Sequence, residues 1–107
     1  MKLIMAIVSK DDSGIVQNQL TKAGYPVTKL ATTGGFLAAG NTTFIIGVSD
    51  GAVETVLKII EKSSSRRTET LASTASFSSD VYPAEPIEIN VGGATIFVLN
   101  VERFEKL

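Results

Sequence analysis

The chain has 107 residues, of which 44% are hydrophobic, and its ten basic and eleven acidic side chains leave a formal net charge of −1. This length predicts a single domain, and the balanced charge without a Lys/Arg cluster argues against a nucleic-acid polymer as partner. The chain contains no histidine and no cysteine, which removes the commonest general base, disulfides and thiolate chemistry. We therefore expect a binding protein without metal or cofactor rather than an enzyme.

The first predicted element is a strand at residues 3–8, an uninterrupted apolar run of the length typical of a strand buried on both faces. The run is too short to span a membrane, and no small-residue cleavage site precedes Lys10. We expect a cytoplasmic protein that is full-length as written and has no membrane partner.

A first helix is predicted after this strand. Asp12 or Ser13 offers an N-cap, and Gly24 fits the C′ position that ends a helix. Apolar side chains recur between them at helical spacing, at Val16, Leu20 and Ala23. Pro26 then marks the beginning of the next strand.

Residues 27–33 and 42–48 are rich in β-branched side chains and predict an antiparallel hairpin around a loop at residues 34–40. Three glycines in this loop allow the backbone to approach a ligand closely. They surround an exposed-looking pair, Phe36 and Leu37. An aromatic ring beside bare backbone amides suits a flat heterocycle attached to phosphate, although the pair could instead bury itself against a neighbouring subunit.

A second helix is predicted after Asp50, which we expect to be its cap. Its apolar stripe has i, i+3, i+4, i+7 spacing and consists of Val53, Val56, Leu57 and Ile60. Glu54 and Lys58 lie four residues apart on the solvent side.

Residues 63–86 show no sustained periodicity and predict a long loop. Arg66 and Arg67 within it could bind phosphate, but we favour a solvated, mobile pair. Phe77 and Tyr82 could close over a ligand or contact another protein. Residues 87–91 and 94–101 are strand-like runs around Gly92 and Gly93, which fit a turn or a bulge.

The element order is β, α, β, β, α, β, which predicts an α+β, ferredoxin-like βαββαβ fold with an antiparallel sheet and both helices on one face. The strands are apolar on both faces and no third helix is predicted. A second copy of the same sheet would cover the other face, so we expect a symmetric oligomer.

With this order in place, the residues resemble a known family. The run Thr28 to Phe44, which contains Lys29-Leu-Ala-Thr-Thr-Gly-Gly-Phe-Leu37 and Gly40-Asn-Thr-Thr-Phe44, together with Val91-Gly-Gly-Ala-Thr95, resembles the PII-like cyclic di-AMP receptors of Gram-positive bacteria. The similarity spans nearly the whole chain. It implies one PII-like domain over residues 1–107 and a homotrimer that binds cyclic di-AMP in clefts between subunits. Loops 34–40 and 63–86 correspond to the T- and B-loops, which ligand binding would reorder.

The resemblance implies roles for individual residues. Thr28 would hydrogen-bond the ligand, and Asn41 would read a polar edge. Gly35, Phe36 and Leu37 would line one adenine, with the Phe36 ring packed on it. Gly47, and Gly92 on a neighbouring subunit, would keep the cleft wall open.

The chain also departs from the family pattern. Pro26 replaces a basic residue, Gly24 replaces a polar amide, and Ala38 replaces a frequent arginine, so the resemblance implies fewer ligand contacts. We expect a cytoplasmic signal-transduction protein that binds this second messenger and acts on an unknown downstream protein. The alternative is a structural trimer or protein-interaction module that binds no nucleotide and uses residues 63–86.

Overall fold

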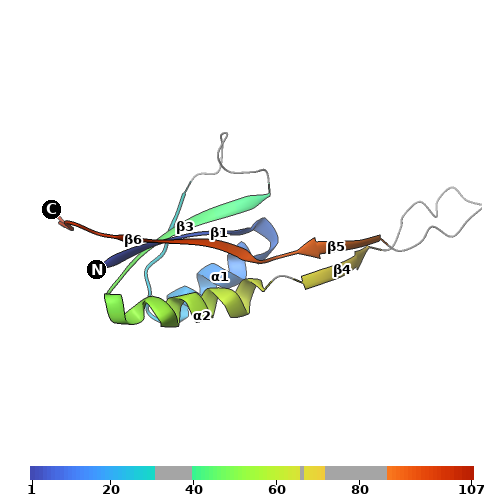
Figure 1. Cartoon of the computed structure of the whole chain (residues 1–107), viewed down its shortest axis with the longest axis horizontal. Helices are drawn as coiled ribbons and strands as arrows, with labels where there is room; N and C mark the ends of the chain where they lie inside the picture. The colour runs from blue at the N-terminus through green and yellow to red at the C-terminus, as the bar shows by residue number, and fades with distance from the viewer. Residues whose placement is uncertain (31–39, 66, 72–86) are drawn as a thin grey trace, which may run out of the picture.

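The computed structural model describes residues 1–30, 40–65, 67–71 and 87–107. Its elements are β1 (Lys2–Ser9), α1 (Lys10–Lys22), β2 (Thr28–Lys29), β3 (Asn41–Val48), the 3-10 helix η1 (Asp50–Ala52), α2 (Val53–Ser64), β4 (Arg67–Leu71), β5 (Ile87–Val91) and β6 (Ala94–Asn100). Four strands form an antiparallel sheet in the order β2-β3-β1-β6, and both helices lie on one face of it (Figure 1). The predicted α+β, ferredoxin-like fold is confirmed.

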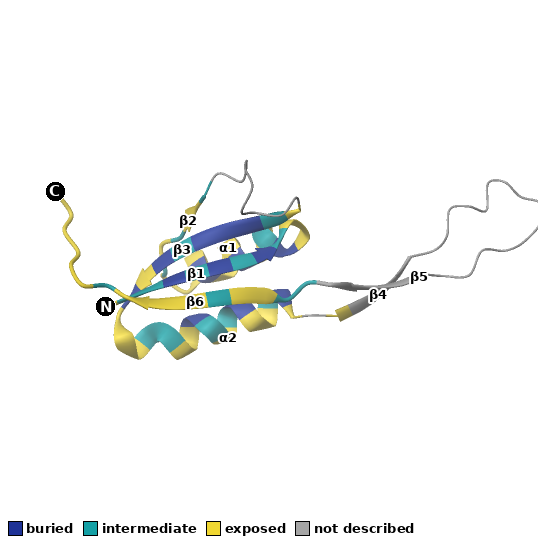
Figure 2. Ribbon diagram, turned by 45° about the horizontal axis from the view of Figure 1, so that its top comes forward, coloured by how far each residue is buried: buried dark blue, intermediate teal, exposed yellow. Residues whose placement is uncertain are grey.

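The strand β1 lies in the middle of this sheet. It pairs with β3 on one side and β6 on the other, so that Ala6 lies opposite both Phe44 and Ile96. Because directly opposed residues point to the same face of an antiparallel sheet, even-numbered side chains of all three strands face the helices. The buried side chains in β1 and β3 are accordingly Ile4, Ala6, Val8, Thr42, Phe44, Ile46 and Val48, with Thr43 in addition. Figure 2 shows β1 and β3 as mostly buried and β6 as mostly exposed.

The two helices complete the core with the stripes that the sequence predicts. Val16 and Leu20 of α1 and Val56 and Ile60 of α2 are buried. The remaining stripe residues of α2, Val53 and Leu57, are partly buried against the same cluster. The prediction that Ala23 belongs to the buried stripe of α1 is wrong, because Ala23 is exposed and is the C-cap of that helix. The predicted N-cap of α1 is wrong, however. The cap is Ser9, whose Oγ accepts a hydrogen bond from the Asp11 N–H at 3.2 Å, so α1 follows β1 without a loop.

The predicted helix cap at Asp50 is also wrong. The helix α2 is preceded by η1, and no side chain caps either element. The Asp50 carboxylate instead lies 2.8 Å from the Met1 ammonium group. The hydrogen bond from this ammonium group, together with its positive charge, lowers the pKa of Asp50 below its ordinary value.

The segment predicted as a loop at residues 63–86 contains regular structure. The helix α2 extends to Ser64, and β4 follows at Arg67–Leu71 and pairs antiparallel with β5. This two-stranded ribbon projects from the end of the sheet where β6 begins (Figure 1). Residues 72–86, with Phe77 and Tyr82, lie outside the described residues, as does Arg66.

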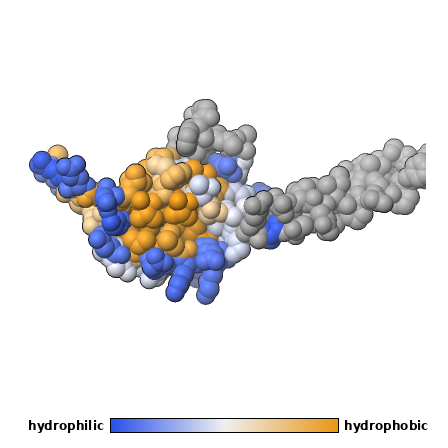
Figure 3. Space-filling view, viewed as in Figure 1, coloured by the Kyte–Doolittle hydropathy of each residue, from blue (hydrophilic) through white to orange (hydrophobic). Residues whose placement is uncertain are grey.

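The face of the sheet opposite the helices carries apolar side chains from three strands. By register it includes Leu3, Met5, Ile7, Ile45, Phe97 and Leu99. Phe97 and Leu99 are 48% and 45% exposed, and Figure 3 shows an apolar surface over the sheet. We refer to this surface as the open face. Within the described ranges, no helix covers it.

The structure of the core predicts that two isoleucines on the helices contribute differently to the free energy of unfolding. Ile60 on α2 is 1% exposed, whereas Ile15 on α1 is 54% exposed. We expect Ile60→Ala to lower the free energy of unfolding by about 2–5 kcal/mol, because it removes buried methyl groups and leaves a cavity. Urea unfolding at one fixed protein concentration measures this change.

Ile15→Ala is the matched control, since it makes the same substitution on a helix surface. Its effect should stay within about 0.5 kcal/mol of the parent. Equal losses in the two variants would contradict the placement of the core between the sheet and the helices.

Candidate functional site

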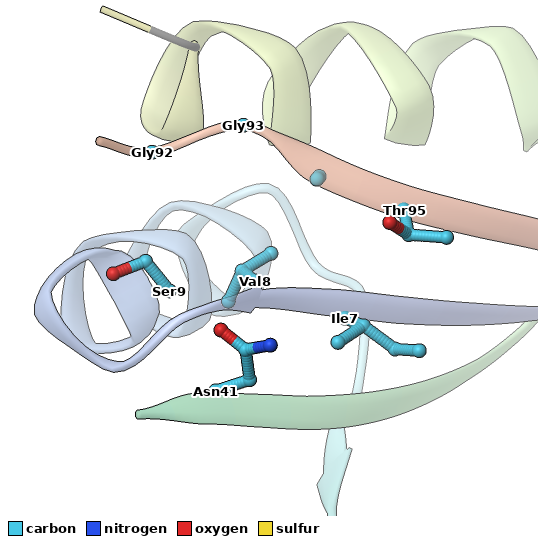
Figure 4. A pocket seen from close by; sticks show the side chains of 8 residues that line it. Ile7, Val8, Ser9, Asn41, Gly92, Gly93 and Thr95 are labelled. Carbon is cyan, nitrogen blue, oxygen red and sulfur yellow. The ribbon is translucent and has the colours of Figure 1, made fainter. Parts of the chain in front are cut away.

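A cavity of about 410 Å³ lies at the end of the sheet where β1 ends and β6 begins. It is lined by residues from β1, the beginning of β3, and the connection between β5 and β6: Ile7, Val8, Ser9, Asn41, Gly92, Gly93, Ala94 and Thr95. In Figure 4, Asn41 and Thr95 stand on the two strands that flank Ile7. Its volume falls within the roughly 300–1,000 Å³ typical of small-molecule sites. We refer to it as the sheet-end pocket.

The end of β1 forms one side of this pocket, and the first residue of α1 holds the chain just before β3. Ser9 lies opposite Asn41 in the β1–β3 ladder. Next along the chain, the Lys10 N–H donates a hydrogen bond to the Gly40 carbonyl oxygen at 2.6 Å. The short β1-to-α1 junction therefore fixes both the position of Ser9 and the point at which the chain enters β3 at Asn41.

Two glycines form the opposite side of the pocket. Gly92 and Gly93 have φ angles of 80° and 88°, in the left-handed region that L side chains rarely adopt. The Gly93 N–H donates a hydrogen bond to the carbonyl oxygen of Ser64 at the end of α2. This turn carries the chain from the β4–β5 ribbon into the four-stranded sheet.

An ion pair lies directly behind Gly92. The Arg67 guanidinium contacts the Asp12 carboxylate twice, with Nη2 to Oδ1 at 2.9 Å and Nη1 to Oδ2 at 3.3 Å. Asp12 is only 3% exposed. The Arg67 side chain is 42% exposed, as a solvated residue would be. The interpretation of Arg67 as a mobile loop residue is wrong, because it begins β4 and pairs with a buried carboxylate, which requires a compensating charge.

The predicted site residues fall into three groups. Asn41 and Gly92 of one chain both line the sheet-end pocket. Thr28 and Gly47 do not: Thr28 pairs with Ile45 at the sheet edge, and Gly47 pairs with Leu3. By register they share the open face with Asn41, but Gly47 lies six residues along β3 from Asn41, or roughly 20 Å. Gly35, Phe36 and Leu37 lie outside the described residues.

Residues that the sequence reasoning did not select also line the pocket. They are Ser9, which follows the predicted strand at residues 3–8, and Thr95, which the sequence marks only as part of the Val91–Thr95 motif. Both line the pocket, and the Ser9 hydroxyl also caps α1. The signal that identifies them is register, since Ile7 pairs with Thr95 and Ser9 pairs with Asn41.

The chemistry of the pocket is that of recognition by hydrogen bonds and apolar contact. Hydroxyl and amide groups from Ser9, Asn41 and Thr95 alternate with the apolar Ile7, Val8 and Ala94. In the described part of the chain, no group of three or more His, Cys, Asp or Glu side chains could hold a metal ion. A helix long and apolar enough to cross a membrane is likewise absent from these residues.

The fold and this pocket define a ferredoxin-like protein with a cavity of small-molecule size at one end of its sheet. A model of the cyclic-di-AMP receptor family matches residues 1–107, the whole chain. A similar solved structure, from a functionally unknown protein of Pediococcus pentosaceus, is 42% identical with a TM-score of 0.78, and the match covers 99% of this chain and 96% of that one. The chain belongs to the cyclic-di-AMP receptor family, which confirms the resemblance found in the sequence.

The close packing of the Gly92–Gly93 turn predicts that a side chain at Gly92 destabilises the protein. A Cβ atom at Gly92 would lie 2.6 Å from Arg67 Nη1 and 2.7 Å from the Ser65 carbonyl oxygen, in addition to requiring a positive φ. We expect Gly92→Ala to lower the free energy of unfolding by about 1–3 kcal/mol, because strain and crowding act together. Thermal or urea unfolding measures the loss.

Gly51→Ala provides the control, because a Cβ atom there meets nothing within 4 Å and needs no positive φ. It should unfold like the parent. A Gly92→Ala protein of parental stability would contradict the close packing of this turn on Arg67 and Ser65.

Proposed function

We propose that this protein is a non-catalytic cytoplasmic receptor that binds cyclic di-AMP at the sheet-end pocket, at the seam between identical subunits, and acts on a partner protein through its loops. The proposal rests on one observation, which is that Asn41 and Gly92 line the same pocket. They are far apart in the sequence and line one cavity of a single chain, whereas the resemblance places Gly92 on a neighbouring subunit.

The pocket supplies the contacts that a purine dinucleotide requires. Asn41 can both donate and accept hydrogen bonds at a base edge, and the hydroxyl groups of Ser9 and Thr95 can serve base, ribose or phosphate oxygen atoms. The Gly92–Gly93 turn exposes backbone without a Cβ atom, so a ligand can approach it closely. Phe36 adds an adenine stack, which is worth about 1–3 kcal/mol per base.

The spread of the remaining site residues supports a site shared between subunits. Thr28 and Gly47 lie on the same face of the sheet as Asn41, but toward the other end of β3. A single small ligand in the sheet-end pocket lies too far from Gly47 of the same chain for direct contact. In a symmetric oligomer, a second chain brings its own copies of these residues to the seam.

The open face supplies the reason for oligomerisation. Exposed Phe97 and Leu99 extend an apolar surface from β6 across β1 and β3 (Figure 3). Contiguous apolar patches of this kind mark interaction sites. We propose that three copies pack through this face to form the homotrimer.

Binding should be specific for one cyclic dinucleotide. We expect calorimetry to give heat with cyclic di-AMP and none with cyclic di-GMP or ATP. Phe36→Ala and Asn41→Ala should each weaken binding about tenfold or more, because they remove a stacked ring and a hydrogen-bonding amide, respectively.

Phe104→Ala and Asn18→Ala are matched controls, because both residues are exposed and lie on the C-terminal tail and on α1. Both should bind as the parent does. Heat with none of the three nucleotides would contradict the receptor and support the structural or protein-binding trimer, whereas turnover of any of them would indicate an enzyme.

The trimer predicts a solution mass of about three times the 11.3 kDa chain. Phe97→Glu should reduce this mass to that of one chain, because it places a charge on an apolar surface that the trimer would bury. Light scattering coupled to size-exclusion chromatography measures both masses.

Ile15→Glu, at an apolar position that is 54% exposed on the helix side, should remain trimeric. A parent protein that is monomeric at micromolar concentration would contradict the proposed site between subunits, whatever the behaviour of the two variants.

A further inference from the structure

We propose that Asp12 and Arg67 are positioning residues for the sheet-end pocket: their ion pair holds the Gly92–Gly93 turn in place and couples ligand occupancy to the position of the β4–β5 ribbon. This inference rests on the proposed function, since it concerns affinity for the same ligand. Neither residue lines the pocket, so their effect is transmitted through the turn.

The ion pair has the geometry of a fixed contact. Both oxygens of the Asp12 carboxylate face the fork of the guanidinium group, at 2.9 and 3.3 Å, and Arg67 Nη1 also donates to the Ser65 carbonyl oxygen at 3.2 Å. A bidentate pair restricts orientation as well as distance. Because Arg67 is the first residue of β4, this contact fixes the base of the ribbon relative to α1.

The Gly92 backbone packs directly against this pair. A Cβ atom at Gly92 would lie 2.6 Å from Arg67 Nη1 and 3.2 Å from Asp12 Oδ2. In addition, Arg67 lies opposite Val91 in the β4–β5 ladder, immediately before the turn. A shift of the guanidinium group therefore displaces the turn, and with it one side of the pocket.

The first turn of α1 links this ion pair to the other side of the pocket. Asp12 belongs to the same turn as the N-cap Ser9, which lines the pocket, and Lys10, whose N–H binds the Gly40 carbonyl oxygen. One helical turn thus contacts the end of the hairpin loop, the pocket and the base of the ribbon. The distance between Asn41 and Gly92, which a bound ligand must match, depends on this turn and on the ion pair.

The test measures cyclic di-AMP affinity by calorimetry in Asp12→Asn, Arg67→Gln and the double variant. We expect each single variant to bind about tenfold more weakly, and the double variant to be no weaker than the weaker single, because one interaction is lost in all three. Arg67→Lys, which retains a positive charge beside Asp12 but not the fork, should show intermediate affinity. It also provides a folded variant if Arg67→Gln does not fold.

Arg103→Gln is the control, because it breaks the exposed ion pair between Arg103 and Glu105 and should bind as the parent does. Parental affinity in both Asp12→Asn and Arg67→Gln would overturn the inference. So would additive losses in the double variant.

A second measurement separates this inference from the receptor assignment. The Gly93 N–H is bonded to the Ser64 carbonyl oxygen, so its hydrogen exchange in the ligand-free protein reports on the turn. We expect exchange about tenfold faster in Arg67→Gln than in the parent or in Arg103→Gln. If the parent binds no cyclic di-AMP, the proposed function fails, and this rate alone decides whether the ion pair holds the turn. An unchanged rate overturns the inference.

Discussion

The arrangement of this protein depends on the pairing of β1 with a strand on each side. Both neighbours are antiparallel, so each residue of β1 from Lys2 to Val8 is opposed by one residue of β3 and one of β6 on the same face. The alternation that buries Ile4, Ala6 and Val8 therefore also decides which side chains face away from the helices. A slip of one residue would exchange the core and the open face, and burial of the core therefore fixes the register of the site as well.

The sequence predicts best those elements whose side chains repeat with a period. The apolar run of β1 and the stripe of α2 both identify their elements, and the order of elements then leads to the sheet topology. The helix caps were predicted less well. Several polar residues near the beginning of α1 can cap a helix, and the choice of Ser9 depends on where β1 stops pairing with β3. Asp50 was assigned to a cap because its actual partner, the Met1 ammonium group, is distant in sequence.

Contacts between polar residues that are far apart in the sequence leave no periodic signal. Such contacts therefore could not be predicted from the sequence. Arg67 and Asp12 are 55 residues apart, and each is typical of a surface residue when considered alone. The strand β4 is short and polar, and only its pairing with β5 distinguishes it from a loop. Asn41 and Gly92 were found only because a family resemblance marked both, since no spacing rule connects two sides of a pocket that the fold brings together.

The connections of the β4–β5 ribbon explain why one site can influence a surface far from it. In the described part of the chain, the ribbon joins the body through the segment after Ser64, the Gly92–Gly93 turn and the Arg67–Asp12 contact. The helix α1, which carries Asp12, packs into the core through Val16 and Leu20. It therefore resists displacement when a force acts on the Arg67–Asp12 contact. A ligand changes the position of the ribbon only if the protein binds it with different affinity in the two positions. In the proposed receptor, a change in the spacing across the pocket would move the ribbon, because the turn lines the pocket and also ends the ribbon. Such a coupling would be reciprocal, so a partner protein that held the ribbon in one position would alter the affinity of the pocket by the same factor.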